Sequence, residues 1–433
     1  MNFSKSASII IAVGYILFIS SVDNDKPKSK SNIFLRVISY VFIIGGYLIR
    51  WDTCLASLPF LIIMMVYVFF DNGKQARRLL PFSGIAISLI LIWGSNFIVY
   101  RADPDWRYWA DYNKERSNLL DYYLVDYDEY AEIYEELGIS RNDHAALSNW
   151  IYADDDIFDL ETIREISRIS KQHLSEYIKL NGQNIEGGIL NCLELFKNYS
   201  IIYVVIFLFL MILPLLKGKD AILLIGAFVA GFGEVLYLMI NLRCPERAFY
   251  TPVLILFSIL IFFMCKAVDK NSVQISILIC FMLIYSFYGS NLYCINRTSG
   301  FRYSNKDEAI QMLEELSARE DNLYVWDGHE QDVLRYVYSP IDVPEFGNEK
   351  NFVMLGGWSV PSPIMSDRTE PFGEKYNYLK LLSNNKNVYF ITEFEEYLGI
   401  IEQYIREHYN PEASVQLVET INMYKIYSFV SNQ

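Results

Sequence analysis

The sequence predicts a membrane α-helical bundle of about eight spans that carries two extracytoplasmic domains, one helical and one α/β. Three observations lead to this fold class. The chain of 433 residues contains long apolar stretches, its acidic residues concentrate in two polar regions, and strand and helix patterns alternate in the second of these regions. A hydrophobic fraction of 52% is above the usual range of about 45–50% for globular proteins.

Eight apolar stretches are candidate membrane spans. A helix needs about 20 apolar residues to cross the hydrocarbon core of a bilayer. The candidates are residues 7–22, 33–49, 53–70, 79–100, 199–215, 221–240, 249–265 and 272–290. So many stretches in one chain favour spans over buried core helices. The first stretch has no small-residue cleavage site and is followed by a charged turn and another span, so we expect it to be retained rather than removed as a signal peptide.

The formal net charge of −14 is unevenly distributed along the chain. The two polar regions have net charges of −11 and −10, whereas the remainder has +7. Nucleic-acid binding is disfavoured because it needs a basic footprint. The predicted domains are 1–100 with four spans, 101–198 as an acidic, aromatic-rich helical domain, 199–290 with four spans, and 291–433 as an α/β domain.

Lysine and arginine in the short loops predict the orientation in the membrane. One set of turns holds ten basic residues, namely Lys26, Lys28, Lys30, Lys74, Arg77, Arg78, Lys217, Lys219, Lys266 and Lys270. The opposite set holds only four, namely Lys5, Arg50, Arg243 and Arg247. The richer side is expected to be cytoplasmic in a plasma membrane. Both termini, the 101–198 region and the C-terminal region are then extracytoplasmic.

Helix signals dominate residues 101–198. Pro104 suits the first turn of a helix, with Asp103 as its cap. Gly138 follows DEYAEIYEEL and is expected to end a helix there. Ser140 and Asp143 have the spacing of a capping box. A further helix is expected from about Asp159 to Leu180.

The C-terminal region predicts a small, partly parallel sheet. The segment 306–320 reads as an amphipathic helix, NLYVWDG as a strand, and 386–409 as a strand followed by a helix. VQLVETI and MYKIYSF are expected to form two closing strands. Polar residues follow the strand ends, where α/β sites often lie, but four such residues are expected by chance. They are Asp327, His329, Thr392 and Glu393.

A pair of carboxylates, Asp103 and Asp105, stands where the fourth predicted span ends. Such a pair can act as a general base toward a sugar hydroxyl, or hold a divalent cation against a lipid phosphate. The alternative is a helix cap beside a solvated charge, because D-x-D is a weak pattern.

Aromatic residues are dense in the same region. Trp109 and Tyr112 are the candidates for stacking on a sugar ring, beside Trp106 and Tyr108. The alternative is an interfacial belt together with a helix core, since Trp and Tyr favour the headgroup level.

Three charged residues near the predicted outer side are candidates for binding a lipid phosphate. Arg243 and Arg247 flank a short turn, and arginine forks bind phosphate bidentately. Glu234 lies inside an apolar span, where an ionisable group marks a site or a paired structural contact. Headgroup anchoring or local salt bridges are the alternatives for the arginine pair.

Other motifs carry less information. The acidic run 154–156 lacks the spacing of an EF-hand loop, so a solvated turn is favoured over calcium binding. The four histidines have no metal-like spacing, and the sequence has no P-loop and no G-x-S-x-G. Four cysteines fall near the outer side, where one disulfide or free thiols are the alternatives, namely Cys54, Cys192, Cys244 and Cys294.

This layout resembles bacterial membrane proteins of cell-surface polysaccharide loci. LGISRNDHAALSNWIYADDDIFDLETI and RCPERAFYTPVL look like segments of that group. More distantly, the plan resembles integral-membrane glycosyltransferases of the GT-C class. That resemblance implies a polyprenyl-phosphate sugar donor and an extracytoplasmic active site, with Asp103 or Asp105 as the base and Arg243 and Arg247 as phosphate ligands. The D-x-D here follows the fourth predicted span, whereas the class usually has its catalytic acid after the first.

The expected function is therefore envelope glycan assembly in the plasma membrane, with sugar transfer from a lipid-phosphate carrier as the leading hypothesis. A different class is a non-enzymatic accessory protein or scaffold that binds glycan or an assembly partner. A transporter or flippase is a third class, which the scarcity of charge within the spans disfavours. No cofactor is expected, with a divalent cation at the carboxylate pair as the alternative.

Overall fold

The computed structural model describes residues 3–22, 30–71, 80–177, 182–241, 244, 246–267, 306–327, 350–392 and 395–429. The chain divides into two compact units, each built from two stretches of sequence. Unit 1 comprises Met1–Phe97 and Ile178–Cys294, and unit 2 comprises Ile98–Tyr177 and Ile295–Gln433.

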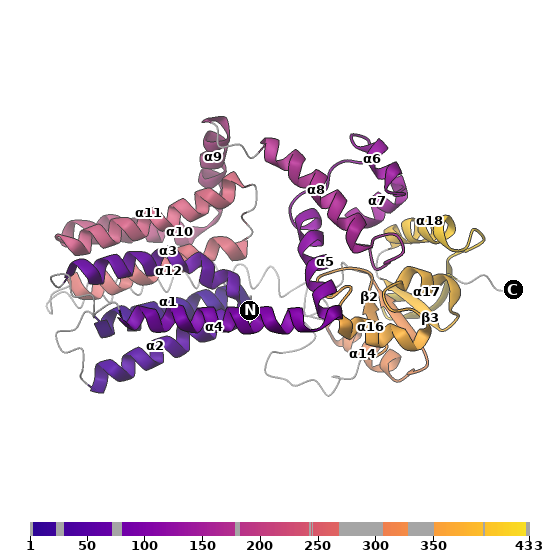
Figure 1. Cartoon of the computed structure of the whole chain (residues 1–433), viewed down its shortest axis with the longest axis horizontal. Helices are drawn as coiled ribbons and strands as arrows, with labels where there is room; N and C mark the ends of the chain where they lie inside the picture. Colours follow the sequence, from indigo (N-terminus) through magenta and orange to yellow (C-terminus); the bar gives the residue numbers. More distant parts are fainter. Residues whose placement is uncertain are drawn as a thin grey trace. The chain divides into compact units, whose positions relative to one another are not determined.

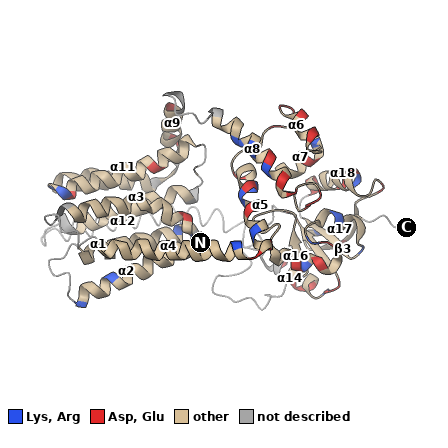
Figure 2. Cartoon of the chain, viewed as in Figure 1, with Lys and Arg blue, Asp and Glu red and all other residues tan. Residues whose placement is uncertain are grey.

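Unit 1 is helical (Figure 1). Its elements are α1 (Phe3–Val22), α2 (Lys30–Ile49), α3 (Trp51–Asp71), most of α4 (Leu80–Ala102), α9 (Gly182–Asn198), α10 (Ser200–Ile212), the 3-10 helix η2 (Leu213–Leu215), α11 (Lys219–Ile240) and α12 (Glu246–Ala267). Figure 2 shows few charged residues along α1–α4, α11 and α12. Exposed apolar side chains run along α4, such as Leu91 and Ile98, as expected for a helix surrounded by lipid.

Six helices in the described part of the chain are long and apolar enough to cross a membrane, and they match six of the eight predicted spans. They are α1, α2, α3, α4, α11 and α12. The predicted span 199–215 corresponds to α10 with η2. It qualifies only together with α9, from which it is bent by 99°. The predicted span 272–290 lies outside the described residues. The structure is consistent with a multi-pass membrane bundle of six helices, or seven with the bent pair.

Small residues and hydroxyl groups hold the first helix in the bundle. A Cβ atom on Gly46 of α2 would lie 2.4 Å from a side-chain carbon of Ile11, so glycine permits the close approach of α1 and α2. The hydroxyl of Tyr15 in α1 bonds to that of Ser57 in α3 at 2.7 Å. These contacts satisfy polar atoms internally, which an apolar surrounding requires.

The first part of unit 2 consists of α5 (Pro104–Leu120), α6 (Ala131–Glu136), α7 (Arg141–Ser148) and α8 (Leu160–Tyr177). The predicted caps are confirmed. Asp103 accepts hydrogen bonds from the first backbone amides of α5, and Ser140 forms a capping box with Asp143. Gly138 adopts a φ of 73°, which favours glycine, just after α6.

The second part of unit 2 contains a five-stranded sheet in the order β2-β1-β3-β5-β4. The strands are β1 (Leu323–Trp326), β2 (Phe352–Met354), β3 (Val388–Thr392), β4 (Gln416–Ile421) and β5 (Tyr424–Ser428). The first three are parallel, and the last two pair antiparallel, so the predicted partly parallel sheet is confirmed. The strand β2 was not predicted.

Helices cover both faces of this sheet, and they are α14 (Lys306–Ser317), α16 (Pro363–Thr369), α17 (Tyr378–Asn384) and α18 (Leu398–His408). Successive residues of β1 alternate between the two faces. Tyr324 and Trp326 pack with α14, whereas Leu323 and Val325 join a larger core. That larger core also contains side chains from α5, α7 and α8. Residues 98–177 and the C-terminal sheet thus share one core.

A shared core has a consequence for membrane topology. The two parts of unit 2 must lie on the same side of any membrane that unit 1 crosses. The chain between Tyr177 and Lys306 must therefore cross that membrane an even number of times. The helices α11 and α12, which lie between the two parts of unit 2 in the sequence, are each long and apolar enough to cross a membrane.

Candidate functional site

The start of α5 positions both carboxylates of the D-x-D motif. Asp103 Oδ1 accepts hydrogen bonds from the backbone N–H groups of Asp105 and Trp106 at 2.9 and 3.1 Å. Asp105 Oδ2 lies 2.7 Å from Nζ of Lys375, and both side chains are about half exposed. The structure thus uses Asp103 as a helix cap, while Asp105 faces solvent in an ion pair with a residue of the C-terminal region.

The loop after β2 brings Trp358 close to α5. The carbonyl of Leu355 accepts hydrogen bonds from the backbone amides of Tyr152 and Ala153. The next residue, Gly356, approaches Trp150 so closely that a Cβ atom would lie 1.7 Å from its carbonyl oxygen. The hydroxyl of Tyr152 donates to the Gly357 carbonyl at 2.6 Å. These contacts fix the loop that presents Trp358.

We define the aromatic patch as Tyr100, Trp106, Trp109 and Trp358. Tyr100 stacks on Trp109 with ring centroids 5.5 Å apart, and Trp106 meets Trp109 edge to face. Trp109 Nε1 donates to the carbonyl of Trp358 at 3.0 Å. The side chain of Trp358 remains 60% exposed. An exposed, positioned aromatic group of this kind can bury the apolar face of a ligand.

Charged and polar groups border the aromatic patch. The amide of Asn113 donates to the Trp358 carbonyl at 2.9 Å. The hydrogen bond to the Asp105 carboxylate raises the pKa of Lys375, which also lies over the ring of Tyr376. An ammonium group beside a carboxylate supplies donors and acceptors for ligand hydroxyls. Aromatic and charged groups together suit a ligand with both apolar and hydroxylated faces.

The other predicted site residues are not all described in the same part of the structure. Tyr112 is only 2% exposed and packs between Tyr108 and Tyr152 in the core of unit 2, so its ring is not on the patch. Glu234 belongs to α11 of unit 1, where its Oε2 is buried without a hydrogen-bond partner among the described residues. Arg243 and the side chain of Arg247 lie outside the described residues.

The acidic run 154–156 joins the two parts of unit 2. Asp154 is buried and accepts hydrogen bonds from the hydroxyls of Tyr404 and Tyr409. The other two carboxylates bond to Tyr108 and to Lys380. Each carboxylate therefore has a protein partner. The prediction of a solvated turn is therefore wrong for Asp154, which is buried, whereas Asp155 is partly exposed and Asp156 is exposed.

Two of the polar residues at the strand ends also have structural partners. Asp327 and Thr392 follow β1 and end β3, and the Thr392 hydroxyl donates to the Asp327 carboxylate at 2.6 Å. Both residues are buried. His329 and Glu393 lie outside the described residues.

Among the described residues, one His and two carboxylates come close enough to suggest a metal site, namely Asp143, Glu407 and His408. Their nearest ligand atoms lie within 4.8 Å of one another. Both oxygens of Asp143 are engaged, one with the Ser140 backbone amide and one with His408 Nε2. Glu407 accepts from the Ser140 hydroxyl. Because these polar atoms already form hydrogen bonds with one another, we interpret the cluster as a structural contact between α7 and α18.

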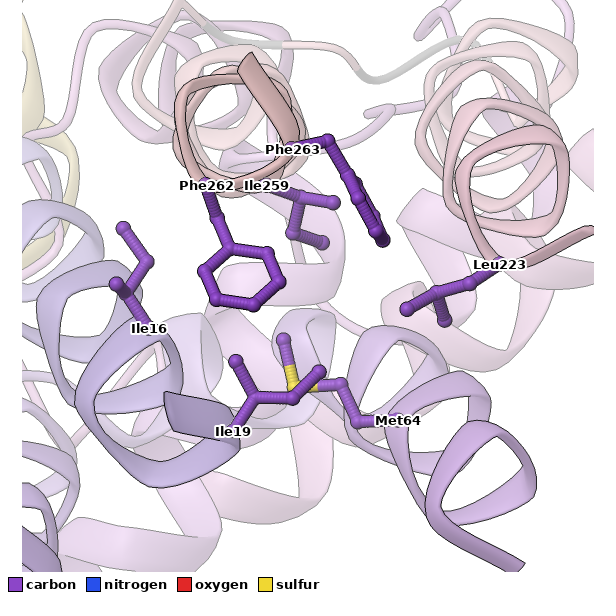
Figure 3. A pocket seen from close by; sticks show the side chains of 7 residues that line it. All are labelled: Ile16, Ile19, Met64, Leu223, Ile259, Phe262 and Phe263. Carbon is purple, nitrogen blue, oxygen red and sulfur yellow. The ribbon is translucent and has the colours of Figure 1, made fainter. Parts of the chain in front are cut away.

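Unit 1 contains a small apolar cavity of about 10 Å³. Figure 3 shows that seven side chains surround it, namely Ile16, Ile19, Met64, Leu223, Ile259, Phe262 and Phe263. None of these side chains carries a nitrogen or oxygen atom, so none can act there as an acid, a base or a hydrogen-bonding group. We interpret the cavity as a small packing defect between the helices of the bundle.

Of the residues in this candidate site, Asp105 and Trp109 were predicted from the sequence, whereas Lys375, Trp358 and Asn113 were not. The sequence signal for Trp358 was its position directly after Gly356-Gly357 and before a proline-rich turn. Comparisons of the chain with protein-family models, curated proteins and solved structures found no match.

Proposed function

We propose that this chain is a membrane protein of cell-envelope glycan assembly that binds a saccharide at the aromatic patch of unit 2. The observation that carries the proposal is Trp358, an exposed indole whose backbone is fixed by Trp109 and Asn113. A pyranose ring has an apolar C–H face that can stack on an indole, while its hydroxyls need the donors and acceptors of groups such as Lys375 and Asp105.

The position of the patch also supports a substrate held near a membrane. Tyr100 stands in the last turns of α4, an apolar helix long enough to cross a bilayer. Tryptophan and tyrosine favour the membrane–water interface. A saccharide linked to a lipid would present its sugar at this level, so the patch suits a lipid-linked sugar as well as a free glycan.

Binding tests this proposal directly. The full chain in lipid nanodiscs is titrated with oligosaccharides of glucose, galactose and N-acetylhexosamines, and affinity is read by calorimetry. We expect Trp358→Ala to weaken binding at least about tenfold, which is ~1.4 kcal/mol. Trp93→Ala is the matched control, because Trp93 is equally exposed but lies on the apolar part of α4. Equal affinities for Trp358→Ala and the wild type would refute the proposal.

Sugar transfer is the second candidate function. The specific observation is Asp105 beside Lys375 at the border of the patch, with a carboxylate that faces solvent. In this proposal Asp105 accepts the proton of the acceptor hydroxyl while the acceptor oxygen forms a bond to the anomeric carbon of the sugar. The bond from that carbon to the donor phosphate oxygen breaks, the lipid phosphate leaves, and Lys375 balances the negative charge that develops on it. Arg243 and Arg247 of unit 1 remain proposed ligands of a lipid phosphate in their own right, because arginine forks bind phosphate bidentately.

The two candidates differ in their response to one substitution. Asp105→Asn is expected to abolish transfer but to leave saccharide affinity within about threefold, because the stacking surface is intact. Surface polysaccharide in cells is measured beside the amount of inserted protein. Normal polysaccharide with Asp105→Asn would exclude transfer through this carboxylate and leave the binding function.

A further inference from the structure

The helices α9 and α10 of unit 1 meet at a bend of 99° and enclose a groove of about 750 Å³. This volume lies within the range of about 300–1,000 Å³ typical of small-molecule sites. The walls are mostly apolar, with Leu193 and Phe196 from α9 and Ile202, Tyr203 and Ile206 from α10. A groove of this size and lining suits a hydrocarbon chain.

The helix α9 is anchored to the bundle on one side. Gly188 lies against α11, where a Cβ atom would come within 2.7 Å of a side-chain carbon of Ile240. One turn later on the same side, Cys192 is buried in the core of unit 1. The position of α9 is therefore set by packing, and the groove does not depend on a loosely held helix.

The other side of α9 carries exposed apolar side chains. Leu190 and Leu193 are 59% and 51% exposed. Leucines left open to water are unfavourable, whereas an amphipathic helix at the level of the lipid headgroups places such residues among acyl chains. Because α9 is bent sharply from the apolar α10, it has the geometry expected of a helix lying along a membrane surface.

Two charges of opposite sign border the groove. Glu194 and Lys197 are the charged residues among its lining side chains in the described part of the chain, and they are one helical turn apart on α9. A headgroup with both a phosphate and an ammonium group complements this pair. A purely anionic headgroup would meet repulsion from Glu194.

From this lining and this charge pair, we infer that the groove between α9 and α10 binds one phospholipid with a phosphoethanolamine headgroup. An acyl chain lies along Phe196, Ile202 and Ile206, the phosphate contacts Lys197, and the ammonium group donates to Glu194. This site is in unit 1 and is independent of the saccharide proposal for unit 2.

The test measures which lipids stay with the purified full chain. The protein is reconstituted in vesicles of equal parts phosphatidylethanolamine, phosphatidylglycerol and phosphatidylcholine, extracted in mild detergent, and examined by native mass spectrometry. We expect one retained phosphatidylethanolamine for each wild-type chain. Lys197→Glu and Leu193→Trp, which reverse the charge and fill the groove, are expected to lower its retention at least about tenfold.

Matched controls separate the groove from the rest of the surface. Lys217→Glu changes an exposed lysine beyond the other end of α10, and Leu210→Trp enlarges an exposed leucine of α10 that does not line the groove. Both are expected to retain the lipid like the wild type. Equal retention in groove and control variants would overturn the proposal. Preferential retention of phosphatidylglycerol, or a cysteine cross-link between position 193 and a second copy of the chain, would also overturn it.

Discussion

The Nε2 atom of His408, at the end of α18, lies 2.8 Å from the Oδ1 atom of Asp143, which is fully buried in α7. The same carboxylate closes the capping box of α7 through the backbone amide of Ser140. One side chain thus stabilises a local helix start and a contact between segments far apart in the sequence. We therefore expect the stability of unit 2 to depend on pH.

The first prediction concerns this histidine. Burial lowers the pKa of His408, but the hydrogen bond and the charge of Asp143 raise it, and the net pKa lies above the ordinary value of 6.5. The folded state therefore holds the proton more tightly than the unfolded state. The stabilisation is complete below about pH 6.5 and is lost as the pH rises through the folded-state value.

Thermal unfolding of the full chain in detergent, followed from pH 5.5 to 8.5, checks this expectation. His408→Gln keeps a donor for Asp143 but does not titrate, so its unfolding temperature should depend less on pH in this range. Wild type and variant with identical pH profiles would show that the pair does not couple to folding.

The second prediction concerns Asp154. Burial raises the pKa of this carboxyl from 3.8 to about 6, although the hydroxyls of Tyr409 and Tyr404 act in the opposite direction. As the pH rises from about 4 to 6, the unfolded state loses its proton first. This group therefore lowers the free energy of unfolding across that window, by up to ~3 kcal/mol.

Two variants of Asp154 should behave differently. Asp154→Asn keeps an acceptor for the tyrosine hydroxyls and should flatten the dependence of stability on pH between 4 and 6. Asp154→Ala leaves both hydroxyls without this partner and should lower the free energy of unfolding by ~1–3 kcal/mol. Urea unfolding at pH 4, 5, 6 and 7 measures both. An unchanged slope with Asp154→Asn would contradict the assignment.

The third prediction concerns the loop that carries Trp358. Gly356→Ala places a Cβ atom against the backbone of Trp150, and a backbone carbonyl cannot move aside as a flexible side chain can. We expect a loss of at least about 1 kcal/mol in stability and weaker saccharide binding, because the loop must shift. Gly399→Ala in α18 is the control, since its Cβ would meet no atom within 4 Å.

The sequence predicted the helices and most strands because their signals are local. Apolar length defines the spans, and Asp103, Gly138 and Ser140 mark helix ends through side-chain or backbone preferences of a few residues. The strand β2 is only three residues long, which is too short for a period of two to be recognised.

The shared core of unit 2 could not be predicted in the same way. Tyr112, Arg116 and Leu119 form the buried face of α5, but an arginine in the middle of that face hides its periodicity. For this reason Tyr112 looked like a surface aromatic residue. The run 154–156 was predicted to be solvated because the tyrosines that bond to it come from α5 and from the end of α18. Contacts between residues so far apart in the sequence do not change the local pattern of polar and apolar residues.

The last prediction separates the two carboxylates of the D-x-D motif. Asp103 caps α5, so Asp103→Ala should lower the free energy of unfolding by ~0.5–2 kcal/mol, whereas Asp103→Asn keeps the acceptor and should cost little. Asp105 forms an exposed ion pair, so Asp105→Asn should change stability by less than about 1 kcal/mol. Stability and surface polysaccharide are measured for all three variants. If Asp103 acts only as a cap, Asp103→Asn retains normal polysaccharide. Loss of polysaccharide with Asp103→Asn at unchanged stability would instead assign the chemistry to Asp103, because the cap would be intact and only the charge would be missing.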